Sequence, residues 1–223
     1  MVAAALALAF LARPAMPRPP AASVASSVLR VRVRVDTRAA ERHVRLADLM
    51  DTVRAIWKPY ADIVFADTAD LGGDGYDEEL QLVVSGRPGS AASGASALGW
   101  ITFAAPGRPA DFVTVSVATA QTLMARNSWM GRRFELLPPV LRQQLVTRAV
   151  SWSAAHEIGH YLLRTDRHAP DGLMKAQLTA ADVMQNGRQW VRLDPRDAET
   201  LRARAARAGL QTKLLLEPPA DEP

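Results

Sequence analysis

The feature that most constrains this chain is the pentapeptide His156-Glu157-Ile158-Gly159-His160. Residues four apart on an α-helix lie one turn above each other, so a helix would present both imidazoles to the same point with Glu157 beside them. Solvated helices also carry histidine and glutamate, but with only 4 histidines in the chain this spacing seldom arises by chance. The pentapeptide therefore predicts a helix that carries two metal ligands and a reactive carboxylate.

Composition limits the classes of protein to which the chain can belong. It has 223 residues, 48% hydrophobic and 22% charged, which is ordinary for a soluble globular protein of one domain with extra residues at each end. Without cysteine, the chain has neither disulfides nor thiolate ligands for a metal. The net charge of +4 comes mainly from scattered arginines, with no compact basic block beyond the alternating Arg30, Arg32 and Arg34. A nucleic acid is therefore not expected as a partner.

Three regions are expected along the chain. Residues 2–12 form an apolar run, which is followed by a segment rich in Pro, Ala and Ser, and this pattern is typical of an export signal. No Lys or Arg precedes the run, which departs from the usual signal, and the run is too short for a stable membrane anchor. We expect residues 1–27 to be a signal peptide or disordered arm, 28–215 to be one domain and 216–223 to be a frayed tail. The protein would then be secreted or periplasmic.

Hydrophobic periodicity predicts the elements of the first half of the domain. Apolar residues alternate with arginines over residues 28–35, which predicts a strand with the arginines on the surface. Helical spacing extends over residues 46–57 and ends before Pro59. Further strands are predicted over 63–66, 79–85, 97–104 and 112–118, with a turn at 71–77, a flexible Gly/Ser/Ala connector at 86–97 and a turn at 106–109.

The second half of the domain is predicted to be helical. A helix can begin at Pro139, and a buried stripe that starts with Val140 and Leu141 continues into the pentapeptide. Asp194-Pro195 is a strong start signal for a last helix, with Asp194 as its cap and Leu201 facing inward.

This order of elements resembles that of the zincin metallopeptidases, in particular the metzincins. The likeness depends on the pentapeptide, on a histidine a short loop later and on the turn Gly172-Leu173-Met174. It is specific over residues 150–175 and loose over 28–210. The resemblance implies an α+β, zincin-like fold: a twisted, mostly parallel or mixed sheet of about five strands, with a backing helix, an active-site helix and a C-terminal helix.

The third metal ligand is where the chain departs from the metzincin pattern. A catalytic zinc takes three protein ligands, so the two helical histidines need a partner from beyond the helix. The pattern places a glycine three residues, and the last ligand six residues, after the second histidine, and here those positions hold Leu163 and Asp166. We favour His168, because two added residues let the helix extend without a positive φ at Leu163. Asp166 is the main alternative. Later carboxylates are a further one, such as Asp182 and Glu199.

The resemblance also implies a function, that of a zinc-dependent peptidase which cleaves within polypeptide substrates. Glu157 would be the general base for a water activated by Zn2+, and Met174 would lie beneath the metal. The strand over 97–104 would bind an extended substrate, with Gly99 permitting close approach and Trp100 shaping a pocket. Met174 and Trp100 are equally compatible with ordinary core packing.

Two other functions stay open at this point. One is a zinc-binding protein of the same fold without activity, and intact Glu157 argues against it because zinc affinity does not require that carboxylate. The other is a zinc hydrolase that acts on a non-peptide amide. The oligomeric state does not follow from the sequence.

Overall fold

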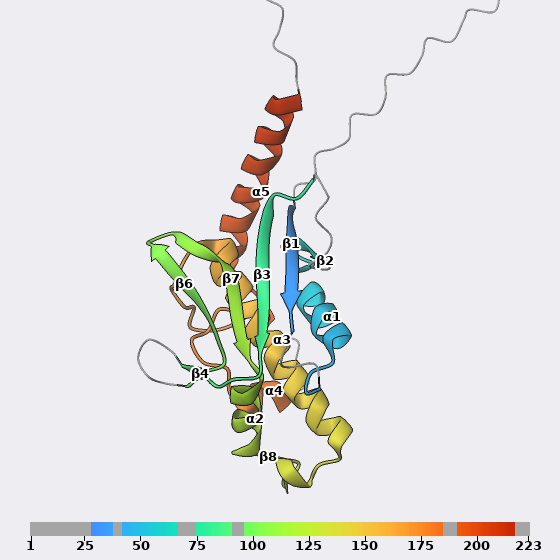
Figure 1. Ribbon diagram of the computed structural model, residues 1–223. Coiled ribbons are helices and arrows are strands. Elements are labelled where there is room, and N and C mark those ends of the chain that lie inside the picture. The colour runs from blue at the N-terminus through green and yellow to red at the C-terminus, as the bar shows by residue number, and fades with distance from the viewer. Residues whose placement is uncertain (1–27, 38–41, 67–74, 91–95, 185–190, 217–223) are drawn as a thin grey trace, which may run out of the picture.

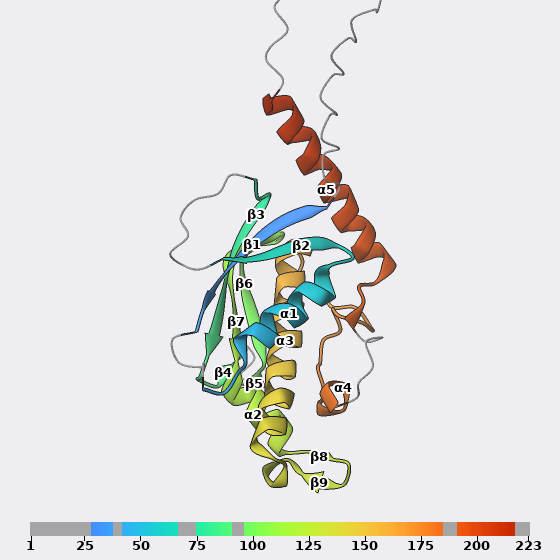
Figure 2. The same cartoon turned by 90° about the vertical axis from the view of Figure 1, so that its right-hand side faces the viewer.

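A five-stranded sheet, covered by helices on one face, forms the body of the protein (Figures 1 and 2). The computed structural model describes residues 28–37, 42–66, 75–90, 96–184 and 191–216. The strand order is β2-β1-β3-β7-β6; the first four strands run parallel and β6, at the edge, runs antiparallel to β7. The strands are β1 (Leu29–Asp36), β2 (Ala61–Ala66), β3 (Glu78–Ser85), β6 (Gly99–Ala105) and β7 (Arg108–Ser116).

Alternation of side chains explains the first strand. In β1, Val31 and Val33 are fully buried in the core, and the arginines that alternate with the valines point to the opposite face of the sheet. The surface position predicted for Arg32 was wrong, because this residue is only 6% exposed. Its guanidinium lies 4.4 Å from the centre of the Tyr76 ring and 3.7 Å from a carboxylate oxygen of Glu79. Both partners come from later in the chain, so the local pattern does not reveal this burial.

Helices α1 (Leu46–Trp57) and α3 (Pro139–Leu163) pack against each other and on the same face of the sheet (Figure 2). In α1, the buried residues are three or four apart, as expected for a helix with one apolar face: Leu49, Val53, Ile56 and Trp57. From Leu145 onwards α3 is buried nearly all round. Val140 is 58% exposed, so the stripe predicted to include it was wrong there, because the first turn of α3 lies beyond the sheet (Figure 1).

Several short elements were not predicted. β7 ends at Ser116, whose hydroxyl accepts a hydrogen bond from the Thr119 N–H (3.0 Å) and caps α2 (Val117–Ala125). The strand predicted over 112–118 was therefore wrong at both ends, because β7 begins at Arg108 and ends at Ser116. Elements of two or three residues leave no periodic pattern. They are β4 (Gly89–Ser90) and β5 (Ser96–Ala97), which pair inside the connector predicted to be flexible, then β8 (Ser128–Trp129), β9 (Arg132–Arg133) and the 3-10 turn η1 (Phe134–Leu136).

The last described elements are α4 (Ala180–Met184) and α5 (Pro195–Leu216). As predicted, an Asp194 carboxylate oxygen accepts a hydrogen bond from the Arg196 N–H (2.8 Å) at the start of α5, and Leu201 is buried. None of the described helices has the length and apolar character needed to span a membrane.

The predicted fold class is confirmed: the protein is α+β, with a mixed sheet of five strands, a backing helix α1, the helix α3 that carries the pentapeptide and a C-terminal helix α5. Some predicted features lie outside the described residues. These are the arm over 1–27, the tail from 217 onwards, most of the turn at 71–77 and the middle of the 86–97 connector.

A buried carboxylate holds the start of α4. Asp182 Oδ2 accepts hydrogen bonds from the backbone N–H and the hydroxyl of Thr179 (2.7 and 2.6 Å), and it pairs with Lys175 at 2.6 Å. Burial alone would raise the pKa of Asp182, but the hydrogen bonds from Lys175 and Thr179 outweigh burial and hold the pKa below its usual value. The folded state therefore stabilises the ionised carboxylate.

We expect Asp182→Asn to lower the free energy of unfolding by about 1 kcal/mol at pH 7, which is typical of a lost helix cap. Because folding lowers the pKa of Asp182, its stabilisation is complete above the unfolded pKa of about 3.9 and is lost as the pH falls through the lower folded pKa. Denaturant titrations with EDTA present should show a difference from wild type at pH 7 that shrinks in acid. Asp111→Asn, at an exposed carboxylate, is the control. A difference in stability that is independent of pH would contradict the assignment of this stabilisation to the ionised Asp182 carboxylate.

Candidate metal centre

The pentapeptide occupies the last two turns of α3, in the interior of the protein. Glu157 and His160 are 6% and 4% exposed, and His156 is half-buried. Burying polar groups in this way costs free energy unless each group has a partner. The contacts of these three side chains therefore indicate what the site can hold.

The two helical imidazoles are oriented by backbone carbonyls. Nδ1 of His156 lies 2.8 Å from the carbonyl oxygen of Leu173, and Nδ1 of His160 lies 2.7 Å from that of Thr165. A carbonyl oxygen only accepts hydrogen bonds, so each Nδ1 carries the hydrogen and each Nε2 keeps a lone pair. The two Nε2 atoms are 3.0 Å apart. Two lone pairs that face each other at this distance repel, and a cation between them removes the repulsion.

His168 approaches this pair from the loop after α3. The helix ends at Leu163, and Arg164, one residue later, takes the left-handed conformation (φ 53°, ψ 42°). The Thr165 N–H then bonds back to the His160 carbonyl oxygen (3.3 Å), as in a Schellman turn. The ring centre of His168 lies 5.3 Å from that of His156 and 4.9 Å from that of His160. One ligand atom of each histidine lies within 4.8 Å of the others.

The carboxylates considered as alternative ligands do not join this group. Of the residues that the structure describes, the only group of metal-ligating side chains this close together is that of the three histidines. Asp166 is exposed on the same loop as His168. Asp182 is held by Lys175 and Thr179, and Glu199 pairs with Arg202 on α5.

The donor set fits zinc. Burial, together with the neighbouring His160, lowers the pKa of His156 to about 4, and burial also lowers the pKa of His160. Both imidazoles are therefore neutral at pH 7, which is the form that binds metals. Zinc takes three such nitrogens at about 2.0–2.1 Å in tetrahedral geometry, which places ligand nitrogens about 3.3 Å apart and close to the spacing of the two Nε2 atoms.

Glu157 lies between α3 and the edge strand β6. A Cβ atom added at Gly99 would come within 2.8 Å of Glu157 Cγ, 3.0 Å of Glu157 Oε1 and 2.4 Å of Ser153 Oγ. Gly99 is thus the point where β6 approaches the helix, and any side chain there would displace the carboxylate. Burial raises the pKa of Glu157 to about 8, and no described residue is found to hydrogen-bond or pair with it. A bound cation would favour the ionised form again.

Met174 lies against the helix between the two histidines. A Cβ atom at Gly159 would fall 2.3 Å from the Met174 sulfur, so the glycine makes room for this side chain, which is 1% exposed. The preceding turn also depends on a glycine, because Gly172 has φ +78° and a Cβ there would lie 2.3 Å from the Arg192 carbonyl oxygen. The sequence singled out Gly172 and Met174, but it did not suggest why Gly159 is a glycine.

A charged network that the sequence did not reveal fixes the end of α3. The Tyr161 hydroxyl lies 3.0 Å from a carboxylate oxygen of Glu78 at the start of β3. Glu78 also pairs with Arg164 (3.1 Å) and with Arg204 of α5, and Arg204 donates to the Leu162 carbonyl oxygen. Burial and the nearby Glu78 raise the pKa of Tyr161, so it stays a neutral donor. The network positions the loop that carries His168. Tyr161 takes part in it through its hydrogen bond to Glu78.

Trp100 packs on the two-stranded ladder formed by β4 and β5. A Cβ atom at Gly89 would lie 2.6 Å from its indole ring, and the residue is half-buried. The contact accounts for the tryptophan by packing alone, and its predicted part in substrate binding stays a prediction.

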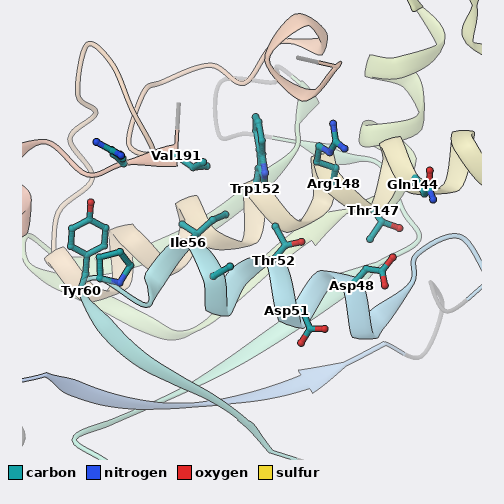
Figure 3. A pocket seen from close by; sticks show the side chains of 13 residues that line it. Asp48, Asp51, Thr52, Ile56, Tyr60, Gln144, Thr147, Arg148, Trp152 and Val191 are labelled. Atoms are coloured by element: carbon teal, nitrogen blue, oxygen red, sulfur yellow. The ribbon is translucent and has the colours of Figure 1, made fainter. Parts of the chain in front are cut away.

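A groove of 1120 Å3 runs along α1 and α3 beside the centre (Figure 3). Its lining includes Asp48 and Asp51 of α1 and Arg148 and Trp152 of α3. Neither Glu157 nor any of the three histidines lines it. Trp152 precedes His156 by one helical turn, so the groove adjoins the metal centre without containing it.

We expect His168→Ala to weaken zinc binding by at least about 100-fold, because even the loss of a residue that only supports a ligand costs 10–100-fold. Asp166→Ala should leave the affinity nearly unchanged. Competition titrations against a chromophoric chelator measure both. The reverse result, with zinc kept by His168→Ala and lost by Asp166→Ala, would make Asp166 the ligand.

Two solved structures are similar to this chain at low sequence identity. A crystal structure of an archaemetzincin from Methanopyrus kandleri is 18% identical, with a TM-score of 0.46, over 82% of this chain and 97% of that one. A crystal structure of a zinc-dependent peptidase from Methanocorpusculum labreanum is 12% identical, also with a TM-score of 0.46, over 77% of this chain and 99% of that one. No protein-family model matches the chain, and no curated protein matches it. The chemistry of the site is therefore inferred from its own geometry.

Proposed function

We propose that this protein is a zinc-dependent peptidase with Glu157 as its general base. One observation carries the proposal: two neutral imidazoles direct their Nε2 atoms at one point, a third imidazole lies beside them, and a buried carboxylate that has no partner among the described residues adjoins them. A zinc ion held there would be bound by His156, His160 and His168.

The number of ligands supports a catalytic site over a structural one. Structural zinc sites have four protein ligands, whereas catalytic sites have three and keep a position for water or substrate. The described part of the chain supplies three histidines to the group, and His168 is exposed, so solvent and substrate can reach this side.

Glu157 would move the proton that hydrolysis requires. Zinc, when bound, supplies a Lewis acid that activates water and polarises the substrate carbonyl. Glu157 would accept a proton from the attacking water as the new C–O bond forms, and donate it to the amine nitrogen as the C–N bond breaks. The close approach of Gly99 would hold the carboxylate in one position.

The edge of the sheet is the observation that favours a polypeptide as the substrate. β6 pairs with β7 on one side and has no partner on its other side among the described strands, and it approaches α3 at Gly99 beside Glu157. An extended peptide could add to this edge through backbone hydrogen bonds. Backbone pairing of this kind does not require recognition of either terminus of the peptide, which favours cleavage within a chain. A non-peptide amide would not need the strand.

Export to the periplasm or the medium is part of the proposal. It depends on the apolar run at residues 2–12. An N-terminal sequence of the mature protein purified from culture would test it.

Glu157→Gln should lower kcat by at least about 100-fold, the low end of the contribution of a general base, and leave zinc content unchanged. Cleavage of casein or of a peptide library, with zinc measured by mass spectrometry on the same samples, provides the test. If the wild-type protein held one zinc ion and cleaved no peptide, a non-catalytic zinc-binding protein would be the better assignment. Activity on small amides alone would favour the other hydrolase.

Gly99→Ala should lower kcat by about tenfold or more, because the new methyl group displaces the Glu157 carboxylate, and small misplacements of catalytic groups are costly. Zinc affinity should stay the same, since the atoms nearest to a Cβ at residue 99 belong to Ser153 and Glu157 and not to a histidine. Thr102→Ala, at an exposed position on the same strand, is the matched control. Full activity of Gly99→Ala would show that this packing does not position the base.

A further inference from the structure

Exposed apolar side chains gather at one end of the protein. Among the described residues, four large hydrophobic side chains are exposed, and three of them lie within eleven residues of the chain: Met130 (83%), Leu136 (71%) and Val140 (58%). They belong to the β8–β9 hairpin, to η1 and to the first turn of α3, which both views place at the end of the molecule opposite to α5 (Figures 1 and 2). We call these three residues the apolar tip.

Met130 lies in the hairpin turn with a backbone conformation that methionine does not favour. Met130 and Gly131 form the two-residue turn between β8 and β9, with φ +51° and +76°. Asparagine followed by glycine is the preferred pair for such a turn, because asparagine and glycine tolerate positive φ more readily than other residues. A methionine here is favoured neither by backbone conformation nor by exposure to water. Strain of this kind is a reason to look for a function of the side chain.

Exposed arginines lie on the same segment of the chain as the apolar tip. Arg126, Arg132 and Arg133 are all exposed on the hairpin and its approach, and the single acidic residue between 117 and 140 is Glu135, 3.5 Å from Arg133. The tip therefore combines protruding apolar side chains with a net positive charge. This combination complements a surface that is negatively charged outside and apolar within.

We propose that the apolar tip docks the protein on anionic lipid membranes. A fluid bilayer accepts separate protruding side chains without a matching shape, whereas a protein partner would need a fitted concave surface. The arginines would contact lipid phosphates while Met130, Leu136 and Val140 enter the acyl boundary. Binding would be peripheral and reversible.

Docking at the tip leaves the metal centre free. Val140 and His156 lie near opposite ends of α3, and at 1.5 Å per residue they are about 24 Å apart along the helix. The proposal is therefore independent of the peptidase function, and tip variants should keep zinc content and cleavage unchanged.

The absence of cysteine from the chain permits a local test. Met130→Cys and, as matched control, Phe112→Cys on β7, the fourth exposed hydrophobic residue (40%), are each labelled with an environment-sensitive dye in the full chain. We expect the label at 130 to shift to the blue and brighten with vesicles of phosphatidylcholine and phosphatidylglycerol, but not with phosphatidylcholine alone. The label at 112 should not respond. Because the readout is local, binding of another segment to lipid does not mimic it.

Charge variants extend the test. Arg132→Gln with Arg133→Gln, added to the labelled Met130→Cys protein, should weaken binding to the mixed vesicles about 25-fold, as each basic residue near an anionic surface contributes about fivefold. Raising the salt concentration should weaken binding in the same way. A label at 130 that ignores anionic vesicles would overturn the proposal. So would a response to protein concentration without lipid, which would make the tip a contact between copies of this chain.

Discussion

The metal centre depends on two hydrogen bonds from imidazole Nδ1 atoms to backbone carbonyls. Thr165 accepts from His160 just past the end of α3, and Leu173 accepts from His156 in the turn that follows Gly172. Each bond orients a ring and leaves its Nε2 as the acceptor that a metal requires. Two loops must therefore be held in place. The charged contacts of Glu78 fix the first loop, and the hydrogen bond from the Leu173 N–H to the Arg192 carbonyl oxygen (2.8 Å) fixes the second.

Three glycines allow the surrounding elements to close on α3. Gly99 brings the sheet edge to Glu157, Gly159 makes room for the Met174 sulfur against the helix, and Gly172 lets its turn meet the segment at Arg192. At each position a Cβ atom would lie less than 3 Å from a neighbouring atom, so the requirement is for space and, at Gly172, also for a positive φ. The carboxylate and the imidazoles are thus held by a helix, a strand and two tight turns, which suits a preorganised catalytic site.

The two ends of α3 differ in character. The C-terminal half is buried and carries His156 and His160, whereas the first turn emerges beyond the sheet and carries Val140 next to the hairpin. A single rigid helix therefore links the proposed catalytic centre to the proposed membrane-docking tip and keeps them well separated. Such an arrangement would hold the open side of the metal centre away from the lipid, where a soluble polypeptide can reach it.

Long elements with one buried face were predictable: α1 has the predicted bounds, and β1, α3 and α5 agree within a few residues. Arg32 and the exposed Val140 were not predicted correctly, because the burial of Arg32 depends on neighbours distant in sequence and the exposure of Val140 on where the sheet ends. The sequence by itself determined the chemistry of the pentapeptide, since helix geometry alone brings His156, Glu157 and His160 together. Only the tertiary structure decided that His168 rather than Asp166 joins them and that Gly99 meets Glu157, because packing between distant segments sets the course of a loop and the approach of a sheet edge.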